Sequence, residues 1–157
     1  MSRTLLIALA AGGSAALLLA AFGFQYLGDL PPCKLCIWQR WPHGVAVVAG
    51  GVALALGAAW AILLGALAAL TTAGVGLYHT GVERGWWEGP TSCTSSGVEG
   101  LSTDQLMDQI MSAPLVRCDD VAWQMAGLSM ASWNAIASLV LAGLWIAAWQ
   151  AGRSRPS

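Results

Sequence analysis

Residues 41–82 read WPHGVAVVAGGVALALGAAWAILLGALAALTTAGVGLYHTGV and contain no charged side chain over 42 positions. An α-helix that crosses the hydrocarbon core of a membrane needs about 20 apolar residues. The stretch is therefore too long for one crossing and has the right length for two crossings joined by a tight turn. We predict the turn at residues 57–60, which places two helices at about 39–56 and 61–80.

Two further stretches, residues 4–28 and 121–152, also lack charged side chains. Each has the length of one crossing, so we expect a first span at about 4–27 and a fourth at about 128–149. The sequence therefore predicts an all-α fold, an integral membrane four-helix bundle that forms one domain over residues 1–157. The two loops on the outer side are expected at about 28–38 and 81–127.

The composition of the chain agrees with a membrane location. Apolar residues make up 57% of the chain and charged residues 10%, the net charge is −1, and the mean hydropathy is +0.64. An average soluble domain carries about 25% charged residues, so an ordinary soluble domain is excluded. Disorder requires low hydrophobicity and nucleic-acid binding requires a basic patch, so both are excluded. Tryptophans at predicted helix ends are expected to form aromatic belts: Trp38, Trp41, Trp60, Trp86, Trp87, Trp145 and Trp149.

The basic residues orient the four predicted spans. Arg3 precedes the first span, and Arg153 and Arg155 follow the fourth, with no acidic residue on that side. All eight acidic residues lie on the other side, together with the remaining basic residues. Because short cytoplasmic flanks carry the excess of Lys and Arg, we expect both termini in the cytoplasm. A cleaved signal peptide at residues 5–20 is disfavoured, because the apolar run continues to Leu27.

All four cysteines lie in the predicted outer loops, Cys33 and Cys36 in the short loop and Cys93 and Cys118 in the long one. Disulfides persist in oxidising extracytoplasmic compartments, so an even number of cysteines there predicts two disulfides. Four cysteines allow three connectivities, and these stay open. Two purely structural disulfides are one interpretation, and a redox-active pair is the other.

The sequence Cys33-Lys34-Leu35-Cys36 favours the redox interpretation. A C-x-x-C pair closes too small a ring to stabilise the fold much, but it brings two thiols together and lowers the pKa of one of them. Arg40 follows Cys36 by one helical turn on the same face, and its charge favours a Cys36 thiolate; an anchor at the membrane edge is the alternative role. The second cysteine pair lacks the spacing of a zinc site, so we expect no metal.

At these residues the chain resembles the DsbB-type disulfide bond formation proteins, a family of quinone-linked membrane thiol oxidases. The resemblance covers nearly the whole chain and includes four spans with cytoplasmic termini. The motifs that carry it are residues 32–40 (PCKLCIWQR), Tyr78-His79, the widely spaced pair Cys93 and Cys118, the Cys118-Asp119 dipeptide, and residues 127–134 (GLSMASWN).

The resemblance implies an electron path from a periplasmic DsbA-like dithiol protein to a membrane quinone, either ubiquinone or menaquinone. The partner would attack Cys93 of a Cys93–Cys118 disulfide, and Cys118 would then engage Cys33. Cys36 would become a thiolate that faces the quinone. The same resemblance implies the bacterial inner membrane as the location, with the cysteines on the periplasmic side.

The resemblance also places Arg40 beside that thiolate and His79 where its imidazole would donate to a quinone oxygen. The alternative for His79 is an interfacial histidine bonded to backbone or water. A haem bound by His79 and His43 would leave the cysteines unexplained. The predicted catalytic residues are thus Cys33, Cys36, Cys93, Cys118 and Arg40, and the predicted cofactor-binding residues are Cys36, Arg40 and His79.

Two other functions stay open at this point. A thiol oxidoreductase of the vitamin K epoxide reductase type also has four helices and uses a quinone, but its C-x-x-C usually follows the other cysteine pair, whereas here it comes first. A small transporter or structural membrane protein with two passive disulfides is the second alternative. Transporters usually carry an ionisable residue in a span, which disfavours that class for a chain with such long uncharged stretches.

The long outer loop contains one predicted helix, residues 101–111. Ser102 can cap its first turn, and Gln105 can complete a capping box. An apolar face follows, which we expect to lie in the membrane interface; packing on the loop's own core is the alternative. This face consists of Leu106, Met107, Ile110 and Met111.

Overall fold

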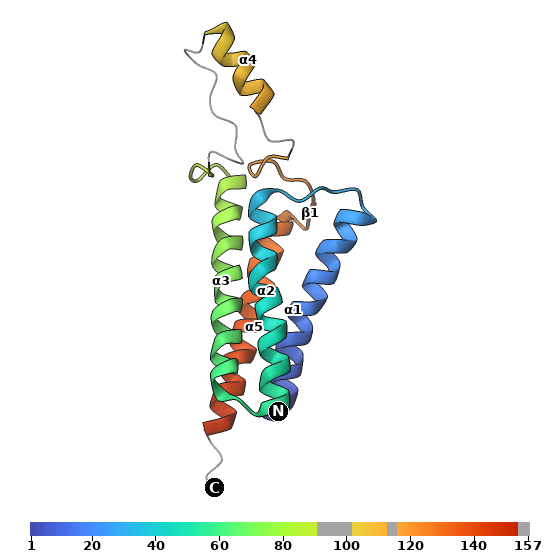
Figure 1. Cartoon of the computed structure of the whole chain (residues 1–157), viewed down its shortest axis with the longest axis vertical. Helices are drawn as coiled ribbons and strands as arrows, with labels where there is room; N and C mark the ends of the chain where they lie inside the picture. The colour runs from blue at the N-terminus through green and yellow to red at the C-terminus, as the bar shows by residue number, and fades with distance from the viewer. Residues whose placement is uncertain (91–101, 113–115, 154–157) are drawn as a thin grey trace.

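The structure, a computed structural model, describes residues 1–90, 102–112 and 116–153. Within these residues it contains five α-helices and one antiparallel hairpin of two strands (Figure 1). The predicted helical character of the chain is therefore confirmed. In chain order the elements are α1 (Arg3–Tyr26), α2 (Lys34–Leu56), α3 (Ala59–Glu83), α4 (Thr103–Ser112), β1 (Gln124–Met125), β2 (Leu128–Ser129) and α5 (Met130–Arg153).

Four long helices, α1, α2, α3 and α5, lie side by side (Figure 1). α3 packs against α2 and α5, and α1 packs against the same two helices. α1, α3 and α5 are each long and apolar enough to cross a membrane. α2 is less apolar, because the polar side chains of Gln39, Arg40 and His43 occupy its first half. The described residues therefore contain three membrane-capable helices, where the sequence predicts four spans.

The connection between α2 and α3 is short and falls within the residues predicted to turn. α2 ends at Leu56 and α3 begins at Ala59. Gly57 between them has a φ of +64°, a left-handed conformation that glycine adopts without the steric cost of a Cβ atom. The guanidinium of Arg3 donates a hydrogen bond of 3.2 Å to the Gly57 carbonyl oxygen, which ties the start of α1 to this turn.

α2 begins at Lys34 rather than near residue 39. Cys33 caps its first turn, because the Cys33 sulfur accepts a hydrogen bond of 3.2 Å from the backbone N–H of Cys36. The usual capping residues are Ser, Thr, Asp and Asn, so the sequence pattern places the start of this helix too late. The early start brings both cysteines of the C-x-x-C pair onto the end of a helix.

The hairpin before α5 is absent from the all-α prediction. Its two-residue turn consists of Ala126 and Gly127, whose φ angles are 52° and 76°. Tight hairpin turns need positive φ at both positions, and the usual sequence signal is Asn-Gly or Asp-Gly. Ala-Gly does not carry that signal, so the strands on either side of it are not recognisable from the sequence pattern.

The bundle has two different ends. We call the end formed by the starts of α2 and α5 the cysteine end, and the opposite end, where the N-terminus and the α2–α3 turn lie, the terminal end (Figure 1). Towards the terminal end the core packs around Trp145, which is fully buried. A Cβ atom at Gly65 would lie 2.5 Å from the Trp145 ring, so only glycine fits there. The prediction of a belt position is therefore wrong for Trp145.

α4 is the helix predicted at residues 101–111. The backbone N–H of Ser102 donates to the Gln105 Oε1 at 2.9 Å, and the N–H of Gln105 donates to the Ser102 Oγ at 3.3 Å. These two bonds confirm the predicted capping box. Met107 and Met111 are exposed, and contact with the membrane interface stays a prediction. The other two members of the predicted apolar face, Leu106 and Ile110, have side chains outside the described ones.

Candidate functional site

Cys33 and Cys36 form the first part of the candidate site, at the start of α2. Both are free thiols, and their sulfur atoms lie 2.8 Å apart, with the Cys33 thiol donating to the Cys36 sulfur. Cys33 is buried, whereas Cys36 is partly exposed. The cap and the first turn of α2 therefore hold two thiols in direct contact, and we call these two residues the inner pair.

The two thiols of the inner pair differ in their electrostatics. The hydrogen bond to Cys36, together with burial, raises the pKa of the Cys33 thiol above its usual range. A thiol that donates a hydrogen bond keeps its proton, and the acceptor is the sulfur better suited to carry negative charge. Arg40 follows one turn later on α2. The arrangement therefore favours Cys36 as the thiolate of the pair.

Cys118 belongs to the same part of the molecule. Its side chain is fully buried and packs in one small cluster with Cys33, Leu35 and Val82. Cys118 is disulfide-bonded, and Cys93, the partner that the resemblance implies, lies outside the described residues. The fold thus brings one member of the second cysteine pair against the inner pair.

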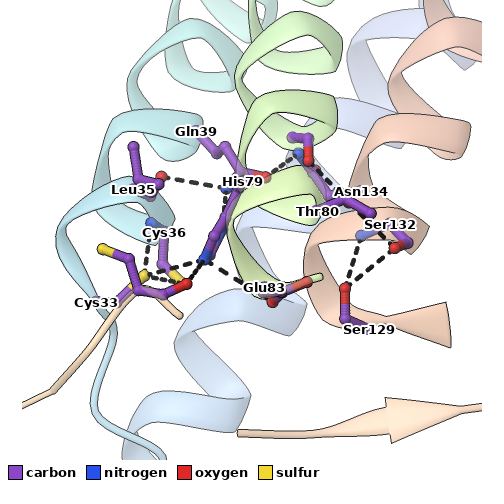
Figure 2. Close-up of polar contacts among 12 residues, drawn as sticks. Cys33, Leu35, Cys36, Gln39, His79, Thr80, Glu83, Ser129, Ser132 and Asn134 are labelled. Carbon is purple, nitrogen blue, oxygen red and sulfur yellow. Dashed lines mark hydrogen bonds and ion pairs between the residues drawn. The ribbon is translucent and has the colours of Figure 1, made fainter. Parts of the chain in front are cut away.

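His79 on α3 is the centre of the polar contacts at the cysteine end (Figure 2). Its Nε2 lies 3.1 Å from the carbonyl oxygen of Cys118 and 3.6 Å from the sulfur of Cys33. The same nitrogen lies 3.8 Å from the Oε1 of Glu83, one turn further along α3. Its Nδ1 lies 3.1 Å from the side-chain nitrogen of Gln39. His79 therefore contacts cysteines of both pairs.

A buried hydrogen-bond chain connects His79 to α5 through Gln39 and Asn134, two residues for which the sequence pattern predicts no role. The Gln39 amide nitrogen donates to the Leu35 carbonyl oxygen at 3.1 Å, and the Gln39 Oε1 accepts from the Asn134 Nδ2 at 2.7 Å. The Asn134 Oδ1 lies 3.0 Å from the Nε2 of His43. The available signal was the polar residue type within otherwise apolar helices, which commonly marks a functional position.

A cavity of about 340 Å³ lies beside these hydrogen-bonded side chains, between α1, α2, α3 and α5. The three residues predicted to bind a cofactor, Cys36, Arg40 and His79, all lie in its wall. Small-molecule sites have this size and are mostly apolar with a few polar groups, so the cavity fits an apolar ring that carries oxygen acceptors, as a quinone does. The other polar lining residues are Gln39, His43 and Asn134, and the large apolar ones include Leu17, Leu18, Phe24, Trp123 and Trp133.

Arg40 lies on the α1 side of the cavity. Its guanidinium donates 2.5 Å to the Gln25 Oε1 and 3.3 Å to the Ala21 carbonyl oxygen, and it lies 5.0 Å from the centre of the Phe22 ring. Among the described residues no carboxylate forms an ion pair with it. A guanidinium held by neutral partners next to an apolar cavity favours negative charge in that cavity, because few other charges compensate it.

The inner pair and His79 also form a group with metal-binding residue types. Their ligand atoms, two sulfurs and one imidazole nitrogen, all lie within 4.8 Å of one another. Cysteine and histidine are the usual zinc ligands. The expected absence of a metal therefore stays a prediction.

Comparison with known proteins connects this chain to one family. The family model described as Disulfide bond formation protein DsbB matches residues 2–148 of the chain. A protein named Disulfide bond formation protein B from Shewanella sp. (strain MR-4) is 32% identical over 93% of this chain and 88% of its own length. Proteins of the same name from Nitrosococcus oceani and Verminephrobacter eiseniae are 31% and 30% identical, over 88% and 84% of this chain and 86% and 77% of their own lengths.

Proposed function

Because the chain belongs to the DsbB family of disulfide bond formation proteins, we propose that it is a thiol oxidase that transfers electrons from a periplasmic DsbA-like dithiol protein to a membrane quinone. Family membership and three membrane-capable helices make it a multi-pass membrane protein with a role in disulfide bond formation. The proposal adds the electron donor, the acceptor and the path between them.

One observation carries the proposal. Cys36, Arg40 and His79 line one apolar cavity of about 340 Å³. Cys118 belongs to the same buried cluster as Cys33, whose sulfur lies 2.8 Å from that of Cys36. A thiol-to-quinone reaction needs a nucleophilic sulfur at an apolar site that a lipid-soluble acceptor can enter. It also needs a second cysteine pair within reach of the first.

The proposed electron path begins at the second pair. Attack by a partner thiolate on Cys93 forms a mixed disulfide, breaks the Cys93–Cys118 bond and leaves the electron pair on Cys118. Attack by Cys118 on an oxidised inner pair then forms a Cys33–Cys118 bond, breaks the Cys33–Cys36 bond and leaves the electron pair on Cys36. Each step exchanges one S–S bond for another and needs a thiolate and an accessible sulfur. The packing of Cys118 against Cys33 supports this order.

The residues around the cavity suit the last step. A bound quinone would accept the two electrons and two protons released when two thiols become a disulfide. Cys36 is the sulfur that accepts the hydrogen bond of the inner pair and also lines the cavity. Arg40 supplies a positive charge and N–H donors on the same wall, which favours both a Cys36 thiolate and negative charge on an acceptor oxygen.

We also propose that α2 is a fourth membrane crossing. Its polar residues Gln39 and His43 are 6% and 3% exposed, so they face the neighbouring helices and not the lipid. Polar groups on the bundle interior are compatible with a crossing helix, because they are paired with other protein groups. Both termini would then be cytoplasmic and the cysteine end periplasmic, in the bacterial inner membrane, as the distribution of basic residues predicts.

The decisive experiment mixes the purified protein with a reduced DsbA-like protein and a soluble quinone, and follows quinone reduction by absorbance. We expect turnover with the wild-type chain and none with Cys36→Ser, because that variant lacks the sulfur proposed to face the quinone. Thr71→Ser is the matched control, since the Thr71 hydroxyl is exposed and bonds its own helix, and it should retain full activity. Absence of turnover with the wild-type chain would refute the proposed function.

A further inference from the structure

The two ring nitrogens of His79 have opposite surroundings (Figure 2). Three acceptors surround the Nε2: the Cys118 carbonyl oxygen at 3.1 Å, the Cys33 sulfur at 3.6 Å and the Glu83 carboxylate at 3.8 Å. The Nδ1 has one partner, the side-chain nitrogen of Gln39 at 3.1 Å. The ring thus has a side of acceptors and a side with a donor.

The identity of each hydrogen-bonding atom follows from the backbone groups at the two ends of this arrangement. A backbone carbonyl can only accept. The Leu35 carbonyl therefore requires the Gln39 NH₂ group on its side, and the same NH₂ group donates its second hydrogen to the Nδ1 of His79. The Cys118 carbonyl can accept only from a protonated Nε2, so it favours the same proton position from the other side of the ring. Both ends assign the same neutral tautomer, with the proton on the Nε2.

The Gln39 amide is itself held against rotation. Its Oε1 accepts from the Asn134 Nδ2 at 2.7 Å, and Asn134 also donates to the Thr72 hydroxyl at 3.2 Å. The Asn134 Oδ1 then receives the Nε2–H of His43 at 3.0 Å. If the Gln39 amide were reversed, its oxygen would face the Leu35 carbonyl and its nitrogen would face the Asn134 NH₂ group, which are two repulsive contacts inside an apolar bundle.

We infer that Gln39 and Asn134 are positioning residues that keep the proton of His79 on its Nε2, so that this N–H holds the Cys118 backbone beside the sulfur of Cys33. The inference rests on the proposed function, because it assigns these residues to exchange between the two cysteine pairs. In that step the Cys118 sulfur attacks Cys33, the Cys33–Cys118 bond forms, the Cys33–Cys36 bond breaks and the electron pair leaves on Cys36. No further oxidant or reductant is needed.

Two polar residues of the cavity wall, His79 and Arg40, then have different tasks. Both nitrogens of His79 are occupied by protein groups, so the ring joins the two cysteine pairs. Arg40 has five N–H groups, of which two are used by Gln25 and Ala21. Arg40 therefore has N–H groups left for an acceptor oxygen in the cavity, while the His79 nitrogens are engaged by protein groups in this structure.

The first test reads the tautomer directly. The chain contains only two histidines, so ¹⁵N NMR of histidine-labelled protein gives two ring systems, and a His79→Gln variant identifies the signals of His43. We expect a protonated Nε2 and an unprotonated Nδ1 for His79 at neutral pH in the wild type. In Gln39→Met, which cannot donate to the Nδ1, we expect a mixture of tautomers. A proton on the Nδ1 in the wild type, or an unchanged spectrum in Gln39→Met, would overturn the inference.

The second test measures the exchange step without quinone. Fully oxidised, quinone-free protein is mixed with one equivalent of a reduced DsbA-like protein, quenched with acid and alkylated, and the thiol state of Cys36 is followed by mass spectrometry. Small displacements of reacting groups cost up to about a hundredfold in rate, so we expect Gln39→Met and Asn134→Leu to slow the release of the Cys36 thiol by about tenfold to a hundredfold.

The matched control is Thr80→Val. Thr80 follows His79 on α3, is buried, and bonds the Ser132 hydroxyl at 3.1 Å, so its loss removes a buried hydrogen bond without touching the positioning residues. Thr80→Val should keep the wild-type exchange rate. An equal loss of rate in all three variants would reduce the effect to general destabilisation and overturn the inference. Because neither readout requires quinone, failure of the proposed quinone reduction would be seen separately.

Discussion

The terminal end and the cysteine end of the bundle hold the same helices together by different means. Towards the terminal end, Trp145 packs directly on Gly65, and alanines fill most of the remaining core. At the cysteine end, α2, α3 and α5 are joined through the side chains of Gln39, His79 and Asn134. Contact between small residues lets helices approach closely in lipid, whereas hydrogen bonds in an apolar interior fix individual atoms in direction.

The difference also shows in the polar groups of the side chain at the centre of each end. The Trp145 indole nitrogen is buried and has no hydrogen-bond acceptor among the described residues, which costs about 1–3 kcal/mol for such a group. Shape therefore decides the position of Trp145. At the cysteine end, both ring nitrogens of His79 and both ends of the Gln39 amide are paired. The directions of these hydrogen bonds decide where the side chains of His79 and Gln39 lie, and a reactive site needs side chains held in this way.

Removing Cys118 should give the largest effect on activity, and the effect should be limited to the chemistry at the cysteine end. In Cys118→Ala we expect complete loss of quinone reduction, because no sulfur remains to attack Cys33. The free Cys93 thiolate should attack the disulfide of the oxidised partner, which forms a mixed disulfide and releases the other partner cysteine as a thiol. Non-reducing electrophoresis and peptide mass spectrometry measure the complex. Thermal unfolding in detergent should change little. A trapped partner on Cys118 in the companion variant Cys93→Ala would reverse the order of attack.

Thiol labelling tests the inequality within the inner pair. Because the pKa of Cys33 is raised, its thiol stays protonated at neutral pH and its alkylation should rise only as the pH approaches that raised value. Each pKa unit changes the thiolate fraction about tenfold, so at pH 7 we expect iodoacetamide to modify Cys36 at least about tenfold faster. In Cys33→Ser, Cys36 should still be alkylated at pH 7, because the serine hydroxyl can also donate a hydrogen bond to its sulfur. Equal rates for both thiols in the wild type would contradict the assignment.

Replacing Arg40, the positively charged residue in the cavity wall, should have a moderate effect on the apparent affinity for quinone. In Arg40→His we expect an apparent quinone affinity about tenfold weaker, which corresponds to the loss of one charge-assisted hydrogen bond, with thermal unfolding nearly unchanged. Steady-state kinetics against quinone concentration measures it. Arg153→His at the other end of the molecule is the control and should match the wild type. Unchanged kinetics in Arg40→His would separate Arg40 from the acceptor.

A substitution at the terminal end should lower stability and leave activity unchanged, the opposite of what is expected at the cysteine end. In Gly65→Val the new side chain meets the Trp145 ring, since even a Cβ atom would lie 2.5 Å from it, and overpacking of this kind costs about 1–3 kcal/mol. We expect a lower unfolding temperature and an unchanged activity per folded molecule. Gly74→Ala on the same helix is the control, because nothing lies within 4 Å of its Cβ position. Loss of activity at wild-type stability would connect the two ends.

Much of the fold follows from local sequence features. The uncharged length of residues 41–82 predicted the turn near Gly57, and Ser102 and Gln105 predicted a capping box that the structure confirms. Such features depend on residues near one another in the chain. The early start of α2 at its cysteine cap and the Ala-Gly hairpin turn were missed, because neither uses the residue types that local rules recognise.

By itself, the sequence determined that the chain is a helical membrane protein with a C-x-x-C pair close to one end of a helix. Only the tertiary structure decided that Trp145 lies inside the bundle and that Gln39 and Asn134 meet at His79. The physical reason is that helices in lipid are apolar on every side, so no polar stripe marks the face that turns inward. That face depends on contacts between helices far apart in the chain, and those contacts also decide which polar groups meet.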